Sequence, residues 1–299
     1  MKSRLVVILG PTASRKSDVA VRAAHLLNGE IVSADSRQVY KGLDIGTGKI
    51  TEAEMQGVPH HLLDIADPRT VFTVSDYKSR AEEAIDDILS RDKLPILCGG
   101  TGLYINAVID NLVIPEVPPN QELREELADK SVEELYERLL ARDPRRAAAI
   151  DPKNPRRLVR ALEVSSALGA VPELSYGAAR YNPIIVGLQI DPKELSVRIQ
   201  KRLDDRLAHG MVQEAEKLHA HGLTFDRMKS LGLEYKYLAL HIEGELSHEE
   251  MRQELFRAIV AYSKRQITWF KKDPRVVWLT PPQILPYLEH ALQALFESR

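Results

Sequence analysis

Apolar runs alternate with amphipathic segments over the first hundred residues, and this alternation predicts strands and helices in turn. The runs that are rich in β-branched and other apolar residues predict buried strands at 4–9, 30–35, 60–65 and 94–100. The segments 17–28 and 75–91 place apolar residues on one helical face and predict helices. Such an alternation predicts a parallel α/β sheet with crossover helices on its faces.

The pattern changes near residue 113. The stretch VIPEVPPN (113–120) is proline-rich and reads as a linker, and 120–170 shows helical periodicity without an obvious strand. A strand pattern returns at 184–190, and helices over 192–272, a short strand at 276–279 and a terminal helix follow. We therefore predict an α/β core formed by 1–112 and 184–299, interrupted by a helical insertion domain formed by 113–183.

Composition narrows the class of protein. Of the 299 residues, 44% are hydrophobic and 28% are charged, which is the balance of an ordinary globular protein. No apolar run reaches the roughly 18 residues of a membrane helix, and the apolar stretch after MKSR is too short for a signal peptide. The single Cys98 excludes an internal disulfide, fits a reducing cytoplasm and is expected to be a small core residue. We expect a cytoplasmic monomer. Its net charge of −2 gives the whole molecule no attraction for nucleic acid, so any RNA partner would have to be held by local basic patches.

Residues 10–17, GPTASRKS, come between the first strand and the first helix and nearly match the phosphate loop G-x-x-x-x-G-K-[ST]. Backbone N–H groups at a helix start attract anions. Lys16 adds a positive charge, and Ser17 adds a hydroxyl that can bind Mg²⁺. We predict a P-loop NTPase-like sheet in which the whole loop holds a diphosphate with Mg²⁺: Gly10, Pro11, Thr12, Ala13, Ser14, Arg15, Lys16 and Ser17. The alternative is an ordinary strand–turn–helix with a surface lysine.

Arg15 stands where the loop pattern has its second glycine. Glycine lets the backbone approach a ligand or adopt unusual dihedral angles, whereas arginine keeps the N–H donor but adds bulk. The side chain either swings outward or joins the phosphate site. Our hypothesis is a loop that still binds a diphosphate, with weaker affinity. No clear second acidic motif of the NTPase kind follows a later strand, so a bound diphosphate leaving group is favoured over ATP hydrolysis.

Asp35 follows the second strand within SADSRQVYKGLDIGTGK (33–49). In an open α/β sheet the carboxyl ends of the strands face the ligand crevice, so Asp35 is expected near the phosphate loop. Its carboxylate could accept a proton or help to hold Mg²⁺, and the alternative is an N-cap of residues 36–39. Gln38 beside it can pair with an adenine edge.

Two further positions lie at strand ends. Thr101 follows two glycines after the strand at 94–100 and should face the same crevice. The other interpretation is a cap of a helix over 102–109, and the two are compatible. His60 and His61 lack a third ligand at metal spacing, so we interpret them as structural.

Five motifs, GPTAS-KS, DSRQVYKGLDIGTGK, GVPHHLLDI, GGTGLYI and KRQITWFKKDPRVVWL, occur in this order over about residues 4–280. Together they resemble the bacterial tRNA dimethylallyltransferase family. The resemblance implies transfer of a dimethylallyl group from dimethylallyl diphosphate to the exocyclic N6 amine of the adenine 3′-adjacent to the anticodon in tRNA. The phosphate loop then holds the diphosphate of the donor, although its motif ordinarily indicates an ATP site. The chain departs from the family pattern at Arg15 and, more mildly, in LGLEYK (231–236).

The resemblance also implies roles for individual residues. Asp35 is the proton acceptor and Thr101 lies in the channel where the two substrates meet, so both are expected to be catalytic. Arg198 and Arg202 share one helix face, and one of them neutralises the diphosphate unless they form a solvated basic face. The residues expected to bind the tRNA anticodon stem-loop are Asp35, Ser36, Arg37, Gln38, Thr101, Arg124, Arg156, Arg157, Arg160, Lys264 and Arg265.

Two basic segments support the expectation of RNA binding. In DPKNPRRLVRALEV (151–164), Leu158, Ala161 and Leu162 are expected to pack beneath the arginines, and a surface helix with spare charge is the alternative. In KRQITWFKK (264–272), the lysines and the arginine could grip the RNA backbone. Trp269 and Phe270 could stack on bases, but we interpret them as buried core aromatics.

Three other functions stay open. An adenylate isopentenyltransferase acts on free nucleotides, but it has little use for an arginine-rich insertion. A small-molecule P-loop kinase would leave DSRQVY without a role. A catalytically impaired RNA-binding homologue is the alternative that Arg15 raises. Incubation with dimethylallyl diphosphate, Mg²⁺ and either tRNA or AMP separates these functions by the nucleoside that is formed.

Overall fold

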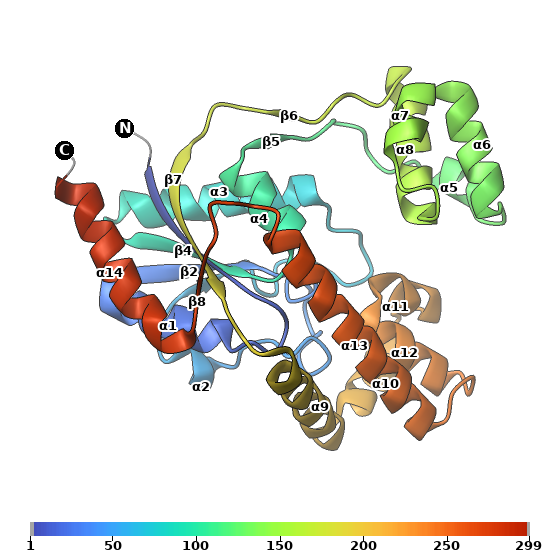
Figure 1. Cartoon of the computed structure of the whole chain (residues 1–299). Helices are drawn as coiled ribbons and strands as arrows, with labels where there is room; N and C mark the ends of the chain where they lie inside the picture. Colours follow the sequence, from blue (N-terminus) through green and yellow to red (C-terminus); the bar gives the residue numbers. More distant parts are fainter. Residues whose placement is uncertain (1–2, 298–299) are drawn as a thin grey trace. The chain divides into compact units, whose positions relative to one another are not determined.

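A six-stranded parallel sheet forms the centre of the core in the computed structural model, which describes residues 3–297, with side chains as far as residue 294 (Figure 1). The strand order is β3-β2-β4-β1-β7-β8, and the pairings between these neighbours are parallel, as the sequence predicts. The strands are β1 (Ser3–Leu9), β2 (Gly29–Ala34), β3 (His60–His61), β4 (Leu94–Gly99), β7 (Tyr181–Leu188) and β8 (Val277–Leu279). Strand β3 is shorter than the predicted 60–65, because Leu62 and Asp64 adopt positive φ angles that end the extended chain.

Different helices cover the two faces of the sheet (Figure 1). These are α1 (Lys16–Leu27), α3 (Val74–Ser90), α4 (Gly102–Ile109) and α14 (Pro281–Glu297), with the short α2 (Glu52–Met55) in the loop before β3. Leu5 and Val7 of β1 pack with α3 and α4, whereas Val6 and Ile8 pack with α1 and α14. Cys98 of β4 lies in the second of these layers, so its expected core position is confirmed, and burial raises the pKa of its thiol to about 11.

The described chain between β7 and β8 folds into five helices with a second apolar core. They are α9 (Pro192–Ala208), α10 (Met211–Ala220), α11 (Phe225–Leu231), α12 (Leu233–Ile242) and α13 (His248–Phe270). Leu203, Leu238 and Leu255 pack there against Tyr40 and Leu43 from the chain after β2. The helices therefore support the segment that carries the acidic motif. Within residues 3–297, no helix combines the length and the apolarity that a bilayer span requires.

Residues Leu112–Gly177 form a compact unit of their own. Its helices are α5 (Gln121–Leu127), α6 (Val132–Arg142), α7 (Pro144–Ala149) and α8 (Pro155–Leu168), and β5 (Leu112–Val113) pairs antiparallel with β6 (Ser175–Tyr176). Leu135, Leu139 and Leu158 form the centre of its core. The unit ends before the predicted residue 183, because β7 begins at Tyr181 and pairs from there with β1.

A cluster of charges lies at the amino-terminal end of β2, opposite to the end that Asp35 follows. The carboxylate of Glu30, which is 2% exposed, accepts hydrogen bonds from Arg91, from Lys93 at 2.7 Å and from His61 at 2.8 Å. The Arg91 guanidinium contributes most to holding the pKa of Glu30 well below its usual range. His61 is therefore structural, as expected, and the cluster fixes β2 to β3 and to the chain that enters β4.

We expect Glu30→Gln to lower the free energy of unfolding at pH 7 by about 2 kcal/mol, because Arg91 and Lys93 lose their counter-charge while remaining partly solvated. Since the folded pKa of Glu30 is depressed, the wild-type advantage is complete above the unfolded pKa of about 4.3 and is lost as pH falls through the folded pKa. Urea unfolding of both proteins at pH 7 and pH 3 measures this. A difference that does not shrink at pH 3 would contradict the ionic explanation.

Candidate active site

The phosphate loop lies between β1 and α1, in the context that its sequence predicts. Ala13 (φ 61°) and Arg15 (φ 65°) adopt the left-handed backbone conformation, and α1 starts at Lys16. The N–H groups in the first turn of a helix have no acceptor within the helix, so they are available to an anion.

Two polar groups of this loop are withdrawn from solvent, Ser14 fully and Lys16 in part. Ser14 Oγ has no hydrogen-bond partner among the described residues. The ammonium group of Lys16 lies 3.4 Å from the carbonyl oxygen of Pro11, and burial lowers its pKa. An anion in the loop would accept hydrogen bonds from both groups and would favour the charged form of the lysine. A diphosphate therefore fits the loop.

Arg15 takes a backbone conformation that glycine adopts easily. Its side chain is exposed, in agreement with the first of the two arrangements considered for it. The backbone N–H stays in place, and the left-handed conformation adds strain of roughly 1 kcal/mol. Arg15 therefore follows the same backbone path that a glycine at this position would readily adopt.

Gln266 of α13 connects the phosphate loop to the loop after β4. Its Oε1 accepts from the N–H of Thr12 at 2.9 Å, and its Nε2 donates to the carbonyl oxygen of Gly100 at 2.9 Å. The side chain is buried, so both ends of its amide are satisfied inside the protein. Because Gln266 occupies the N–H of Thr12, a contact from Thr12 to a diphosphate would come from its hydroxyl.

Asp35 follows β2 and forms a turn rather than the start of a helix. Its Oδ1 accepts from the N–H groups of Arg37 at 2.8 Å and Gln38 at 3.3 Å. The side chain of a helix N-cap would make the same hydrogen bonds, but residues 36–39 form a turn and not a helix. They fix the orientation of the carboxylate. Its second oxygen makes no hydrogen bond recorded within the described residues.

Thr101 follows β4 and contacts the turn that Asp35 begins. Its Oγ1 accepts from the N–H of Ser36 at 3.1 Å, and the hydroxyl of Tyr262 on α13 lies nearby. Thr101 is also the N-cap residue of α4, as the helix-cap interpretation expects, although its hydroxyl makes no capping hydrogen bond to the helix. We call the loops that follow β1, β2 and β4 the strand-end site.

Three charged groups of the strand-end site interact electrostatically. Burial is the largest effect on Lys16 and on Arg202, and the pKa of each is lowered overall. The negative charge of Asp35 is a smaller effect that acts in the opposite direction on both. Arg202 also donates from Nη2 to the carbonyl oxygen of Gly48 at 2.8 Å. Arg198 pairs instead with Glu194 at 2.5 Å, one turn away on α9. Of the two predicted arginines, Arg202 is therefore the one whose charge interacts with those of Lys16 and Asp35.

A carboxylate from α10 holds the glycine-rich loop at 44–49. Glu214 accepts three backbone N–H hydrogen bonds of 2.7–3.0 Å, from Asp44, Ile45 and Gly46. It also accepts from the hydroxyl of Tyr235 at 2.6 Å. Gln38 donates from Nε2 to the carbonyl oxygen of Gly48 at 3.2 Å. The other amide hydrogen and the oxygen of Gln38 thus remain for an adenine edge.

The predicted RNA-binding residues of the core differ in their exposure to solvent. Arg37 is half-buried and donates to the carbonyl oxygen of Ser36 at 3.2 Å. Lys264 and Arg265 are exposed on α13, where the Arg265 guanidinium lies 5.8 Å from the centre of the Tyr262 ring.

The two aromatic residues at the end of α13 differ. Phe270 is 3% exposed, so its expected core position is confirmed. Trp269 is 42% exposed, so the same expectation is wrong for Trp269.

In the insertion, the predicted RNA-binding arginines divide into two pairs. Arg124 and Arg160 bind the buried carboxylate of Glu163, at 2.6 and 3.2 Å. Arg156 and Arg157 are exposed. The expected packing beneath them is confirmed, because three apolar residues of α8 are buried: Leu158, Ala161 and Leu162.

Ser17 is the residue of the loop that fits Mg²⁺. No group of three or more His, Cys, Asp or Glu side chains that could hold a metal occurs in the described part of the chain. Mg²⁺ commonly binds through one or two protein oxygens together with phosphate oxygens and water. A hydroxyl on the first turn of α1, next to a bound diphosphate, fits that arrangement.

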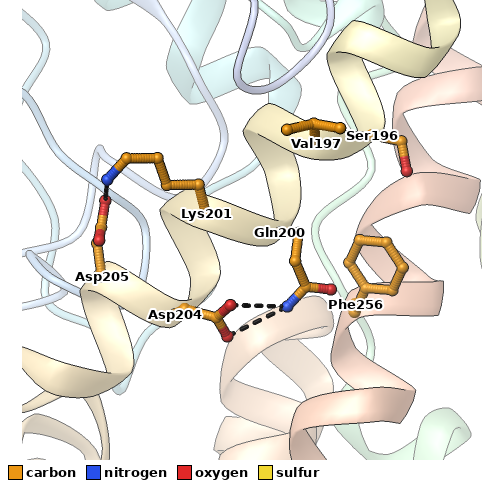
Figure 2. Close-up of a pocket in the computed structure, with 7 residues that line it drawn as sticks. All are labelled: Ser196, Val197, Gln200, Lys201, Asp204, Asp205 and Phe256. Atoms are coloured by element: carbon orange, nitrogen blue, oxygen red, sulfur yellow. Dashed lines mark hydrogen bonds and ion pairs between the residues drawn. The ribbon is translucent and has the colours of Figure 1, made fainter.

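A separate cavity of about 450 Å³ lies between α9 and α13 (Figure 2). Gln200 donates there to Asp204 at 3.0 Å, and Lys201 pairs with Asp205 at 2.8 Å. Its polar side chains satisfy one another and none of them belongs to the strand-end site, so we leave this cavity out of the candidate active site.

Tyr262, Gln266 and Glu214 are site residues that the sequence analysis misses. Tyr262 and Gln266 are four residues apart on α13, and Trp269 follows three residues later. The helical spacing of these three residues places them on one face of α13, and this spacing was the signal in the sequence that could have indicated the face. Glu214 has no local signal, because its role depends on how α10 packs against the loop at 44–49.

The fold and the strand-end site define a class of protein: a P-loop-like α/β fold with an anion loop and a carboxylate at neighbouring strand ends. A model of the IPP transferase family matches residues 38–273. The chain belongs to this family.

Curated relatives match nearly the whole chain. The tRNA dimethylallyltransferase 1 of Geotalea daltonii is 45% identical over 275 residues, which are 92% of this chain and 89% of the relative. The tRNA dimethylallyltransferase of Salinispora arenicola is 43% identical over 279 residues, which are 92% of this chain and 82% of the relative.

Solved structures agree with this membership. The full-length tRNA isopentenylpyrophosphate transferase of Bacillus halodurans is 37% identical with a TM-score of 0.75, and the match covers 99% of this chain and 98% of that one. A eukaryotic dimethylallyltransferase acting on tRNA is 25% identical with a TM-score of 0.79, covering 93% of this chain and 74% of the other. The predicted fold class and the family resemblance are confirmed.

We expect Arg15→Gly to raise the free energy of unfolding by about 1 kcal/mol, because glycine adopts the positive φ without a Cβ clash. The affinity for inorganic pyrophosphate should change by less than about fivefold, because an exposed charge contributes under ~1 kcal/mol. Urea unfolding and titration calorimetry measure the two effects. Arg15→Ala, which removes the charge but keeps Cβ, is the matched control. A gain in affinity well above about tenfold would show that arginine harms the site.

We expect Gln266→Leu to weaken pyrophosphate binding by about tenfold, because the Thr12 N–H and the Gly100 carbonyl oxygen lose their buried partner and the loop loses its support. Titration calorimetry with pyrophosphate measures the change. Gln253→Leu is the matched control, since Gln253 is exposed on the same helix. Equal affinities in Gln266→Leu and wild type would argue against a coupling between α13 and the loop.

Proposed function

We propose that this protein transfers a dimethylallyl group from dimethylallyl diphosphate to the N6 amine of the adenine 3′-adjacent to the anticodon in tRNA. Membership of the IPP transferase family supports the reaction, and both curated relatives described above are named tRNA dimethylallyltransferases. The observation that carries the proposal is that β1, β4 and β2 end at the same level, with Leu9, Gly99 and Ala34 paired, which would put a leaving diphosphate in the phosphate loop beside the proton acceptor Asp35. The charges of Lys16 and Arg202 interact with that of Asp35 there.

The phosphate loop serves the leaving group. The bond from the N6 nitrogen to the allylic carbon forms as the bond from that carbon to the diphosphate oxygen breaks, and the diphosphate takes the bonding electrons. Lys16 and Arg202 neutralise the charge that develops on it, and the buried Ser14 hydroxyl donates a hydrogen bond to it. Mg²⁺, which we propose to be held by Ser17, would neutralise further charge on the same oxygens when bound.

Asp35 and Thr101 serve the acceptor. An exocyclic adenine amine is a poor nucleophile, because its lone pair is delocalised into the ring, so it needs a base as it attacks. The Asp35 carboxylate, oriented by the N–H groups of Arg37 and Gln38, accepts the amine proton. The Thr101 hydroxyl, fixed by Ser36, orients the amine toward the donor.

The RNA must release its adenine from the stack before the base can enter the strand-end site. We assign phosphate contacts to the exposed cations of α8 and α13, which are Arg156, Arg157, Lys264 and Arg265. Arg124 and Arg160 neutralise Glu163, so we give them a supporting role within the insertion. We further propose that the protein acts as a monomer in the cytoplasm on the anticodon stem-loop.

Incubation with dimethylallyl diphosphate, Mg²⁺ and either tRNA or AMP, followed by nucleoside analysis, tests the proposal. Prenylated adenosine from tRNA alone supports it. Product from AMP would select the free-nucleotide transferase, and tight tRNA binding without product would select the catalytically impaired homologue.

We expect Asp35→Asn to lower kcat by about 10²- to 10⁴-fold, because the amide cannot accept the amine proton. The Kd for dimethylallyl diphosphate should stay close to that of the wild type, because the amide keeps the shape of the side chain. Single-turnover prenylation of tRNA and titration calorimetry measure the two quantities. Asp44→Asn, at an exposed carboxylate that pairs with Lys49, is the matched control. Prenylation by Asp35→Asn at the wild-type rate would remove Asp35 from the mechanism.

A further inference from the structure

A large aromatic side chain is exposed beside the strand-end site. Trp269 continues the face of α13 that carries Tyr262 and Gln266, and it is 42% exposed. Its ring lies against Gly102, because a Cβ on that glycine would come within 2.3 Å of the indole. Gly102 directly follows Thr101. The indole is therefore a close neighbour of the site to which the adenine is assigned.

Hydrogen bonds hold the indole in one orientation. Its Nε1 donates to Asn106 Oδ1 at 2.9 Å, and Asn106 donates to Asp110 at 2.8 Å. Asp110 in turn pairs with Arg275 at 2.7 Å. The core does not require this ring, because Phe270 beside it fills the buried position. A rigid exposed ring loses little conformational entropy when another ring stacks on it.

Exposed cations flank the indole along the chain. Arg265 lies four residues before it on α13, and Lys271 and Lys272 follow just past the end of the helix. Proteins bind single-stranded nucleic acids with this combination, in which cations contact the phosphates and bases stack on aromatic rings. The charge of this surface therefore complements an RNA loop.

We propose that Trp269 stacks on a nucleobase of the tRNA anticodon loop that neighbours the extruded adenine, while Arg265 and Lys272 contact the flanking phosphates. The inference rests on the proposed function. An adenine that leaves its stack exposes the face of the adjacent base, and the indole replaces the lost stacking partner. Trp269 is thus a positioning residue, which orients the RNA without touching the reacting atoms.

Fluorescence gives a direct test, because the chain has two tryptophans and Trp278→Phe leaves Trp269 as the single reporter. We expect an anticodon stem-loop RNA to quench this fluorescence at saturation, because a base covers the ring. Dimethylallyl diphosphate alone should leave it unchanged. An unquenched signal with saturating RNA, or quenching by the donor alone, would overturn the inference.

Kinetics gives a second test. Trp269→Ala should raise the Kd and the KM for the RNA by about tenfold or more, with the KM for dimethylallyl diphosphate unchanged. Trp269→Phe keeps a stacking ring and should recover most of the RNA affinity. Trp278→Phe, the matched change in β8, should leave both KM values unchanged. Wild-type RNA affinity in Trp269→Ala would overturn the inference.

These outcomes are distinct from failure of the proposed function. A wild-type protein that binds the stem-loop with quenching but forms no prenylated adenosine would overturn the proposed reaction and support the stacking surface. A wild-type protein that prenylates tRNA, with Trp269→Ala equal to it in RNA affinity, would overturn the stacking surface alone.

Discussion

Leu9, Gly99 and Ala34 are paired across the three neighbouring parallel strands β1, β4 and β2, so the chain leaves all three strands at the same level. The residues that follow these strand ends begin the phosphate loop, the loop to Thr101 and the turn of Asp35. Gly99 is essential to this register, because a Cβ there would lie 2.1 Å from the carbonyl oxygen of Ala34. A side chain at this position would force the strands apart and separate the diphosphate site from the base.

Helix α13 connects the loops at the strand ends to one another, which the sheet alone does not do. Tyr262 contacts Thr101, and Gln266 joins the phosphate loop to the loop after β4. One helix face therefore contacts the elements that serve the donor and those that serve the acceptor. Since a buried amide is costly to leave unpaired, this face also limits independent movement of the two loops. The family model matches the segment that contains this face, residues 38–273.

The sequence predicts those parts of the structure that depend on local pattern. Apolar runs predict β1 and β4 because both faces of the sheet are covered, and the phosphate loop is recognisable because its chemistry is contiguous along the chain. Contacts between residues that are far apart along the chain are harder to predict from the sequence. Trp269 and Phe270 are adjacent aromatics, and only the packing of α13 decides which one is buried. From the sequence, Arg124 and Arg160 are expected to be available for RNA. In the fold, both pair with the buried carboxylate of Glu163. The contacts of Gln266 likewise join residues that are far apart in sequence.

The half-buried Lys16 and the Ser14 hydroxyl, which has no partner among the described residues, have a consequence for turnover. In the proposed reaction these groups would recognise the two phosphates and not the hydrocarbon tail, so the pyrophosphate released in each cycle would satisfy them as well as the donor does. If the proposed reaction holds, a protein built in this way would be inhibited by its own product. Its net flux then depends on how quickly the surrounding solution removes pyrophosphate, and a pyrophosphatase in the same compartment would pull the reaction forward.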